Sequence, residues 1–234
     1  AVAMGTGVMI GAGIFALTGQ IAELAGPLFP LSFVVGAIVT AFSAYTYIKM
    51  SNAYPSAGGI GMILKKAYGP TTVAAGAALL MALSMVINES LVARTFGTYT
   101  LRAFGSDPDS VLVPILGVGL IVLAWLVNVS GSRSVGLFSI LMAVLKVGGI
   151  ALFGAAGLWA SGISFEASAG DSSASGFVAS LALSILAFKG FTTITNSGAE
   201  VTDPHRNVGR AIVLAIAICV VVYLLVAFAV GSSL

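Results

Sequence analysis

The 234-residue chain is too apolar to fold in water, since 59% of its residues are hydrophobic and 8% are charged. Soluble domains carry roughly 25% charged residues, so this composition cannot supply a water-exposed surface. The formal net charge of +2 is too small to indicate a nucleic-acid partner. The composition therefore predicts an integral membrane protein whose surroundings are the lipid bilayer.

Seven stretches are long and apolar enough to cross the hydrocarbon layer, which needs roughly 20 residues of helix. They are continuously apolar rather than alternating, which excludes a β-barrel and predicts an all-α fold in one transmembrane domain. The expected spans are 1–22, 28–50, 71–99, 111–129, 134–160, 176–200 and 208–231. The chain begins inside an apolar stretch without an initiating Met and stops just after another one, so we expect a fragment.

Lys and Arg are distributed unevenly between the two sides of these spans. With the N-terminus in the cytoplasm, Arg102 is the only basic loop residue that falls outside. The basic residues then placed inside are Lys49, Lys65, Lys66, Arg133, Arg206 and Arg210. This positive-inside bias predicts a multi-pass protein of the cell membrane with a cytoplasmic N-terminus.

Segments 1 and 6 contain patterns that favour an interruption of the helix. Segment 1 carries Gly7, Gly11 and Gly13, and segment 6 carries Lys189 and Gly190 before a cluster of hydroxyl residues. Glycine lowers the cost of leaving helical geometry, and interrupted helices in corresponding positions of two repeats indicate the central site of a transporter. The alternative is that Gly7 and Gly11 form a GxxxG pair for close helix packing. The second interruption favours the transporter interpretation.

Three groups of motifs resemble one known family. They are GAGIF at 11–15 with AGP at 25–27, YPSAGG at 54–59 with YGP at 68–70, and FKGF at 188–191 with GAEV at 198–201, DPHRN at 203–207 and RAI at 210–212. In that order they resemble segment 1 with its exit loop, a re-entrant cytoplasmic loop at 54–70, and segment 6 with the loop into segment 7 of the amino acid–polyamine–organocation (APC) superfamily. The resemblance covers nearly the whole chain.

The resemblance implies a LeuT-type inverted-repeat helical bundle with segments 1 and 6 broken. The chain would hold the first repeat and the first two helices of the second, truncated after segment 7. It also implies a secondary active transporter of amino acids that works by alternating access. Segments 1, 2, 6 and 7 would then move against segments 3, 4 and 5 and their counterparts beyond this chain.

The implied amino acid substrate would lie between the two interruptions. Its carboxylate would contact the backbone amides of residues 11–13, at the N-terminus of the outer half-helix. Its ammonium would face the carbonyl groups of Ile10 and Phe188. The expected substrate-binding residues are Ile10, Gly11, Ala12, Gly13, Phe188, Lys189, Gly190 and Thr192.

Two lysines lie inside expected spans. Lys146 is near the middle of segment 5, where an ionisable residue is a functional hypothesis by default; snorkelling to an interface is the alternative. In proton-coupled relatives a similar lysine touches the segment 1 break, so the resemblance implies that Lys146 couples protons to transport. Lys189 stands where relatives often have an apolar residue, and Thr192 where they have an acidic one. Repulsion by Lys189 would disfavour a second ammonium, so we expect neutral amino acids.

The loop after segment 6 carries charges that could latch a cytoplasmic gate, namely those of Glu200, Asp203, Arg206 and Arg210. A solvated loop is the alternative interpretation.

Other classes of protein fit the sequence less well. It has no HExxH, GxSxG or Cys/His ligand cluster, so we expect neither an enzyme nor a metal or other cofactor. The spans also lack the polar stripe of a channel. An amino acid exchanger and a membrane amino acid sensor of the same fold stay open as alternatives. Sodium coupling, the identity of the amino acid, the direction of transport and the oligomeric state are also left open by the sequence.

Overall fold

The computed structural model describes residues 1–105, 107, 110–160 and 173–231, and every regular element in these ranges is a helix. By length and composition, six helices of the described residues can cross a membrane. These are Thr18–Ala53, Thr72–Ala103, Leu112–Val129, Arg133–Trp159, Ala174–Thr195 and Pro204–Ala229. The predicted all-α membrane fold is therefore confirmed.

Segment 1 accounts for the difference between seven expected spans and six. Its first part is a shorter apolar helix, Val2–Gly11, and its second part begins the long stretch Thr18–Ala53. That stretch changes direction at Gly26, whose φ of +52° is readily adopted only by glycine. The seven spans with their individual bounds stay a prediction.

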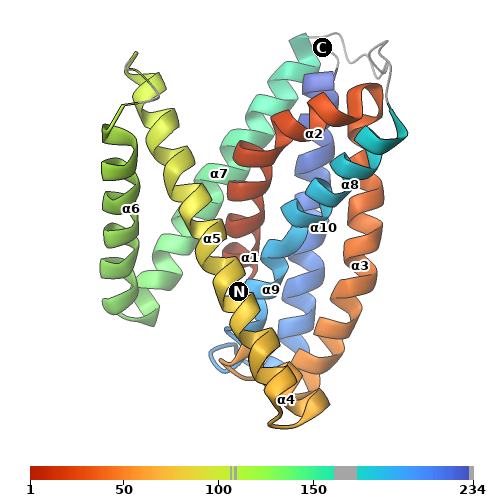
Figure 1. Ribbon diagram of the computed structural model, residues 1–234, viewed down its shortest axis with the longest axis vertical. Helices are drawn as coiled ribbons and strands as arrows, with labels where there is room; N and C mark the ends of the chain where they lie inside the picture. Colours follow the sequence, from red (N-terminus) through yellow and green to blue (C-terminus); the bar gives the residue numbers. More distant parts are fainter. Residues whose placement is uncertain (106, 108–109, 161–172, 232–234) are drawn as a thin grey trace. The chain divides into compact units, whose positions relative to one another are not determined.

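The helices of the chain fall into two compact units (Figure 1). The first consists of Ala1–Ile63 and Ile140–Leu234, and the second of Leu64–Ser139. The α-helices are α1 (Val2–Val8), α2 (Thr18–Ala25), α3 (Phe29–Ala53), α4 (Gly59–Tyr68), α5 (Thr72–Ala103), α6 (Leu112–Val129), α7 (Ser132–Ala160), α8 (Ala174–Phe188), α9 (Thr192–Thr195) and α10 (Pro204–Gly231). Three other helical turns interrupt them, namely the π-helix η1 (Met9–Leu17) and the 3₁₀ turns η2 (Gly26–Leu28) and η3 (Lys189–Phe191).

The core of the first unit lies around α3, which packs against both α8 and α10. Four aromatic rings meet there. The ring centroids of Phe33 and Tyr223 are 5.1 Å apart, those of Phe188 and Tyr223 are 4.9 Å apart, and Phe29 packs edge-on against Phe33. These rings join α3, α8 and α10 at the end of α8, where the second interruption begins.

Small residues bring α3 close to α8. A Cβ atom on Gly36 would lie 2.8 Å from the Cβ atom of Ser184, so only glycine fits there. One turn earlier, the buried hydroxyl groups of Ser32 and Ser180 form a hydrogen bond of 2.8 Å. Close backbone approach and buried polar bonds between helices are the usual means of packing inside lipid, where burying apolar surface gives no advantage.

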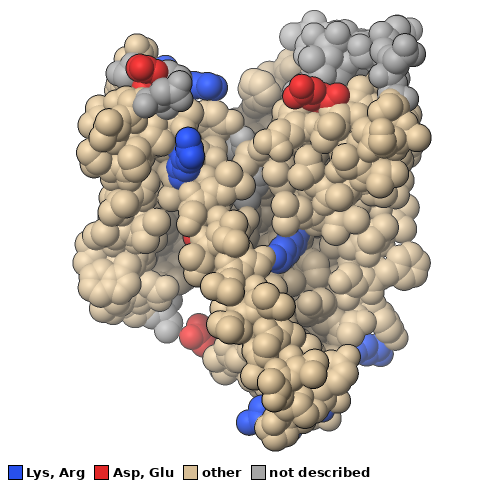
Figure 2. Space-filling model, in the orientation of Figure 1, with Lys and Arg blue, Asp and Glu red and all other residues tan. Residues whose placement is uncertain are grey.

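The second unit consists mainly of α5 and α6, which contact each other through small residues. A Cβ atom on Gly97 would lie 2.5 Å from the carbonyl oxygen of Val113, and one on Gly117 would lie 3.1 Å from that of Ala93. The outward side chains of both helices are largely apolar and exposed. On the face of the molecule drawn in Figure 2, charged side chains are few, as expected for helices surrounded by lipid.

Candidate functional site

Segment 1 is interrupted by a π-helix. The α-helix α1 ends at Val8, η1 occupies Met9–Leu17, and α2 begins at Thr18. We expected non-helical backbone here, and the structure has a wider helical turn instead. The physical reason is that a π-helix still pairs its amides with carbonyl groups five residues earlier, whereas unwound backbone at membrane depth needs other partners. The hydroxyl group of Thr18 also donates to the carbonyl of Gly13 at 3.3 Å.

Segment 6 is interrupted differently. The helix α8 ends at Phe188 and is followed by the 3₁₀ turn η3, the single turn α9 and then irregular turns up to Pro204. Hydroxyl side chains donate additional hydrogen bonds to carbonyl groups at this point. Thr192 donates to the carbonyl of Lys189 at 3.0 Å, and Thr195 donates to that of Thr192 at 2.6 Å. The predicted interruption at this point of segment 6 is therefore present in the structure.

The two interruptions touch each other through their backbones. A Cβ atom on Gly190 would lie 2.7 Å from Cγ of Met9 and 2.8 Å from its backbone nitrogen. Real Cβ atoms essentially never approach that closely, so a side chain at residue 190 would push η3 away from η1. A second contact follows one turn on, where a Cβ atom on Gly5 would lie 2.5 Å from Cδ1 of Ile194. The glycines thus permit contact between the two segments.

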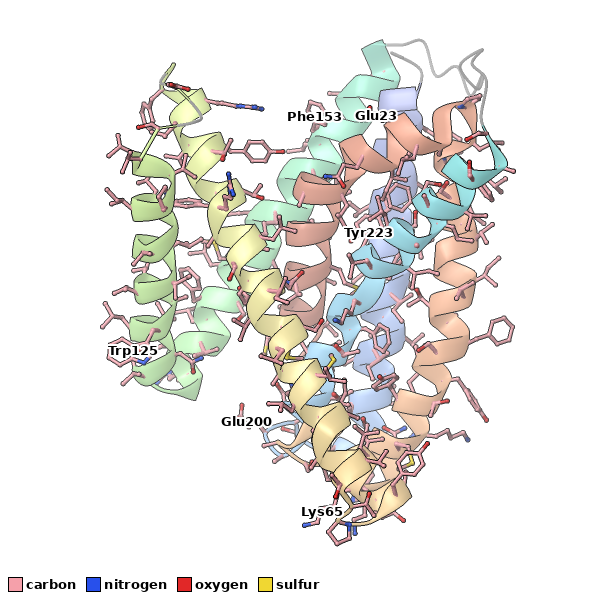
Figure 3. All side chains as sticks on the ribbon, viewed as in Figure 1. Glu23, Lys65, Trp125, Phe153, Glu200 and Tyr223 are labelled. Atoms are coloured by element: carbon pink, nitrogen blue, oxygen red, sulfur yellow. The ribbon has the colours of Figure 1, made fainter. Side chains whose placement is uncertain are left out.

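Tyr223 of α10 joins both interruptions, and the sequence did not single it out. Its fully buried hydroxyl group donates to the carbonyl of Met9 at 2.6 Å and to that of Ala187 at 3.0 Å. A phenol has one proton, so the two carbonyl groups share it. A Cβ atom on Gly13 would collide with this hydroxyl group. Figure 3 shows Tyr223 among the helices of the first unit.

The carbonyl groups joined by Tyr223 are each one residue before those expected to face the substrate ammonium. The expected groups belong to Ile10 and Phe188, and the side chains of both residues are fully buried. The sequence does contain a signal for Tyr223, because this tyrosine places a polar hydroxyl group in an otherwise apolar stretch of α10. A buried tyrosine usually has a hydrogen-bond partner for its hydroxyl group.

Lys146 of α7 reaches the first interruption from another side. Its amino group donates to the carbonyl of Gly7 at 3.4 Å, and a Cβ atom on Gly11 would lie 3.2 Å from its Nζ atom. A largely apolar cavity of about 590 Å³ adjoins it. The residues that line this cavity are Ile14, Thr18, Leu145, Lys146, Gly149, Ile150, Phe153 and Val226.

The remaining expected substrate residues lie around the same contact. Gly190 is buried against η1, Thr192 is buried with its hydroxyl group turned back to η3, and Lys189 is half-buried. Gly11 and Gly13 lie within η1, together with the backbone of Ala12. The structure thus brings the two groups of expected residues together at η1 and η3.

The role of the charged loop after segment 6 in a cytoplasmic gate stays a prediction. No ion pair of the described part of the chain joins Glu200, Asp203, Arg206 and Arg210. Asp203 adopts a φ of +49° instead, and its carbonyl accepts the amide hydrogen of Asn207 at 3.0 Å. Arg206 and Arg210 line a separate cavity with the end of α3. Within the same described ranges, no group of three or more His, Cys, Asp or Glu residues could hold a metal ion.

Comparison with known proteins gives a consistent result. Residues 1–233 match a family described as amino acid permease. The chain is 30% identical over 234 residues to the inner membrane transport protein YbaT of Escherichia coli, covering 99% of this chain and 54% of that protein. It is 28% identical to the branched-chain amino acid permease BcaP of Lactococcus lactis, covering 94% of this chain and 52% of that protein. It is 27% identical to the methylthioribose transporter of Bacillus subtilis, covering 95% of this chain and 51% of that protein.

Apolar helices, two of them interrupted where they touch, define a multi-pass membrane protein built like a transporter. The chain belongs to the amino acid permease family, which confirms the resemblance to the APC superfamily. The family and these relatives are permeases and transporters rather than enzymes, as the sequence predicts. The chain spans about half the length of the curated relatives it matches.

Proposed function

We propose that the full-length protein is a secondary active transporter of neutral amino acids that works by alternating access in the cell membrane, with its N-terminus in the cytoplasm. The observation that carries this proposal is the backbone contact between η1 and η3, two interruptions five segments apart. Transporters with inverted repeats bind substrate where such interruptions meet. Membership of the amino acid permease family supports an amino acid as the substrate.

The substrate carboxylate binds the amides of Gly11, Ala12 and Gly13 in this proposal. In a π-helix these groups take part in helical hydrogen bonds, so binding requires part of η1 to open. The cost of opening is offset by hydrogen bonds to the charged carboxylate, which are stronger than those between neutral groups. The interruption therefore serves as a binding element that changes shape when it is occupied.

The substrate ammonium competes with Tyr223 for carbonyl groups. Ammonium is a donor with three hydrogens, whereas the phenol offers one hydrogen to the carbonyls of Met9 and Ala187. A shift of Tyr223 leaves at least one of these carbonyl groups for the substrate, beside the expected groups of Ile10 and Phe188. The charge of Lys189 in η3 disfavours a second ammonium on the substrate, which supports a preference for neutral amino acids.

Protons are the proposed coupling ion, and Lys146 is the residue that carries them. Its amino group contacts the carbonyl of Gly7 in the last turn of α1, which leads into η1. Burial disfavours the charged form of an amine, whereas a carbonyl contact favours it. A change in η1 on substrate binding alters that contact, so proton binding and substrate binding at this point are linked.

Uptake by proteoliposomes tests the proposed function. The full-length protein is reconstituted, and radiolabelled alanine, leucine, glutamate and arginine are offered with and without an imposed pH gradient. We expect saturable uptake of neutral amino acids that an inward proton gradient drives above equilibrium. Uptake only against preloaded substrate would indicate an exchanger, and binding without flux would indicate a sensor. Preferential uptake of arginine would contradict the role given to Lys189.

A further inference from the structure

A second cavity, of about 630 Å³, lies between the C-terminal end of α3 and the N-terminal end of α10. Its volume falls within the range of sites that bind small molecules. None of its lining residues belongs to η1 or η3. The lining residues are Ile48, Asn52, His205, Arg206, Gly209, Arg210, Val213 and Leu214.

Specific hydrogen bonds hold the two walls of this cavity together. The side-chain carbonyl of Asn52 accepts the amide hydrogen of Gly209 at 3.0 Å, and the backbone carbonyl of Asn52 accepts a hydrogen bond from Nδ1 of His205 at 2.7 Å. A Cβ atom on Gly209 would lie 2.7 Å from the Asn52 side chain, so glycine permits this approach. The cavity is therefore a fixed feature of the contact between α3 and α10.

The polar end of the cavity carries positive charge. Arg206 and Arg210 lie one helical turn apart, His205 is adjacent, and no acidic residue is among the lining residues that the structure describes. Within the described part of the chain, neither guanidinium group takes part in an ion pair or hydrogen bond. Arginine matches the geometry of a phosphate group through paired donors. This end of the cavity therefore suits a phosphate group.

The other end of the cavity is apolar and continues along the exposed face of α10. Val213 and Leu214 line the cavity and are 54% and 55% exposed. At 100° per residue, Val213, Ala217 and Val221 lie on the same face of the helix as the two arginines. Val221 is 65% exposed, and this face is opposite the one that packs into the core. A ligand that fills both ends needs a phosphate group and a long apolar part.

We propose that this cavity binds the headgroup phosphate of an acidic phospholipid, whose acyl chains lie along the exposed face of α10. A free phosphate would use the arginines but not the apolar end. With the predicted orientation the arginines face the cytoplasmic leaflet, where anionic lipids attract basic residues near the membrane surface. The proposal does not depend on transport, so it is tested by lipid binding alone.

The test measures lipids retained by the full-length protein. The protein is equilibrated with equal amounts of phosphatidylglycerol and phosphatidylcholine, and bound lipids are counted by native mass spectrometry. The double variant Arg206→Gln/Arg210→Gln removes both charges. Arg206→Lys/Arg210→Lys keeps them, and Lys65→Gln removes a charge from α4, which does not line the cavity. Size-exclusion profiles and thermal midpoints show whether each variant folds.

We expect wild type and Lys65→Gln to retain phosphatidylglycerol over phosphatidylcholine. The double glutamine variant should lose this preference by roughly tenfold or more, since each basic residue near an acidic lipid contributes to binding. The lysine variant should keep part of it. Equal retention of both lipids by wild type would overturn the proposal, as would equal loss in Lys65→Gln. Displacement of the lipid by an equal concentration of inorganic phosphate would indicate a free-anion site and would also overturn it.

Discussion

The two interruptions leave α-helical geometry in opposite ways. In segment 1, Met9–Leu17 widens to a π-helix and α2 continues from it. In segment 6, Lys189–Phe191 narrows to a 3₁₀ turn, one further turn follows, and the helix then ends. Segment 1 has more glycines around its interruption and yet stays helical. Glycine content alone therefore does not decide how a membrane helix is interrupted.

The hydrogen-bonding groups at the two interruptions also differ. In segment 6, the hydroxyl groups of Thr192 and Thr195 donate hydrogen bonds to carbonyl groups of η3 and α9. Segment 1 has fewer hydroxyl residues near its interruption, and a π-helix keeps its backbone hydrogen bonds within the segment. Segment 1 thus keeps its hydrogen bonds within the helix, whereas segment 6 adds side-chain donors after α8 ends.

The largest effect is expected where the two interruptions touch. In Gly190→Val, the new side chain would collide with the backbone nitrogen of Met9, which cannot move without its helix. Overpacking costs roughly 1–3 kcal/mol and occasionally more, and we expect the upper end of this range with loss of transport. Thermal unfolding of the purified full-length protein measures it. The control is Gly119→Val, where nothing lies within 4 Å of the added Cβ atom; equal destabilisation by both variants would contradict the contact.

The next effect concerns coupling rather than stability. We expect Lys146→Ala to abolish proton-driven uptake while keeping some exchange of substrate, because the amine beside Gly7 and η1 is lost. Counterflow and gradient-driven uptake by the same proteoliposomes separate the two activities. Lys65→Ala, which removes an exposed charge elsewhere, should change neither. Full proton-driven uptake by Lys146→Ala would exclude Lys146 as the coupling residue.

A smaller effect is expected from Tyr223→Phe, which removes the donor shared by both interruptions. The two carbonyl groups then lose the hydrogen bond that they share, at a cost of roughly 0.5–1.5 kcal/mol. The matched control is Tyr47→Phe, because the ring of Tyr47 packs edge-on against Phe191 of η3 with centroids 5.4 Å apart. Thermal midpoints should fall for Tyr223→Phe and stay within error for Tyr47→Phe. A fall of the same size in both would show that the shared hydrogen bond contributes nothing specific.

The smallest effects distinguish two glycines of α1. An added Cβ atom at Gly5 would meet Ile194, whereas one at Gly7 would meet nothing within 4 Å. We expect Gly5→Ala to lower stability by about 1 kcal/mol through overpacking. Gly7→Ala should be neutral or slightly stabilising, since alanine favours the helix. Equal loss at both positions would instead support the GxxxG packing interpretation of Gly7.

The sequence predicted the class of fold and the positions of both interruptions because these depend on local properties. Continuous apolar runs determine the helices, and Gly190 with the hydroxyl residues after it marks the second interruption. The form of the first interruption could not be predicted, because it depends on whether other groups reach the backbone of η1. The role of Tyr223 depends on packing between residues far apart in the chain, 214 residues in the case of Met9.

The charged residues of the loop after segment 6 also depend on packing that the sequence does not show. Glu200, Asp203, Arg206 and Arg210 are close in sequence and suggest a network, yet no ion pair joins them in the described residues. Arg206 and Arg210 instead line a cavity with the end of α3, where the side chain of Asn52 bonds to the backbone of Gly209. Proximity in the sequence did not predict the direction of these side chains.

The close approach at Gly190 has a mechanical consequence. With no space for a methyl group between residue 190 and Met9, η3 cannot advance toward η1 unless η1 retreats. Tyr223 resists their separation as well, since it is bonded to the carbonyls on both sides. While Tyr223 keeps both hydrogen bonds, the two interruptions therefore move as a pair, and either can move alone only after that shared hydrogen bond is released.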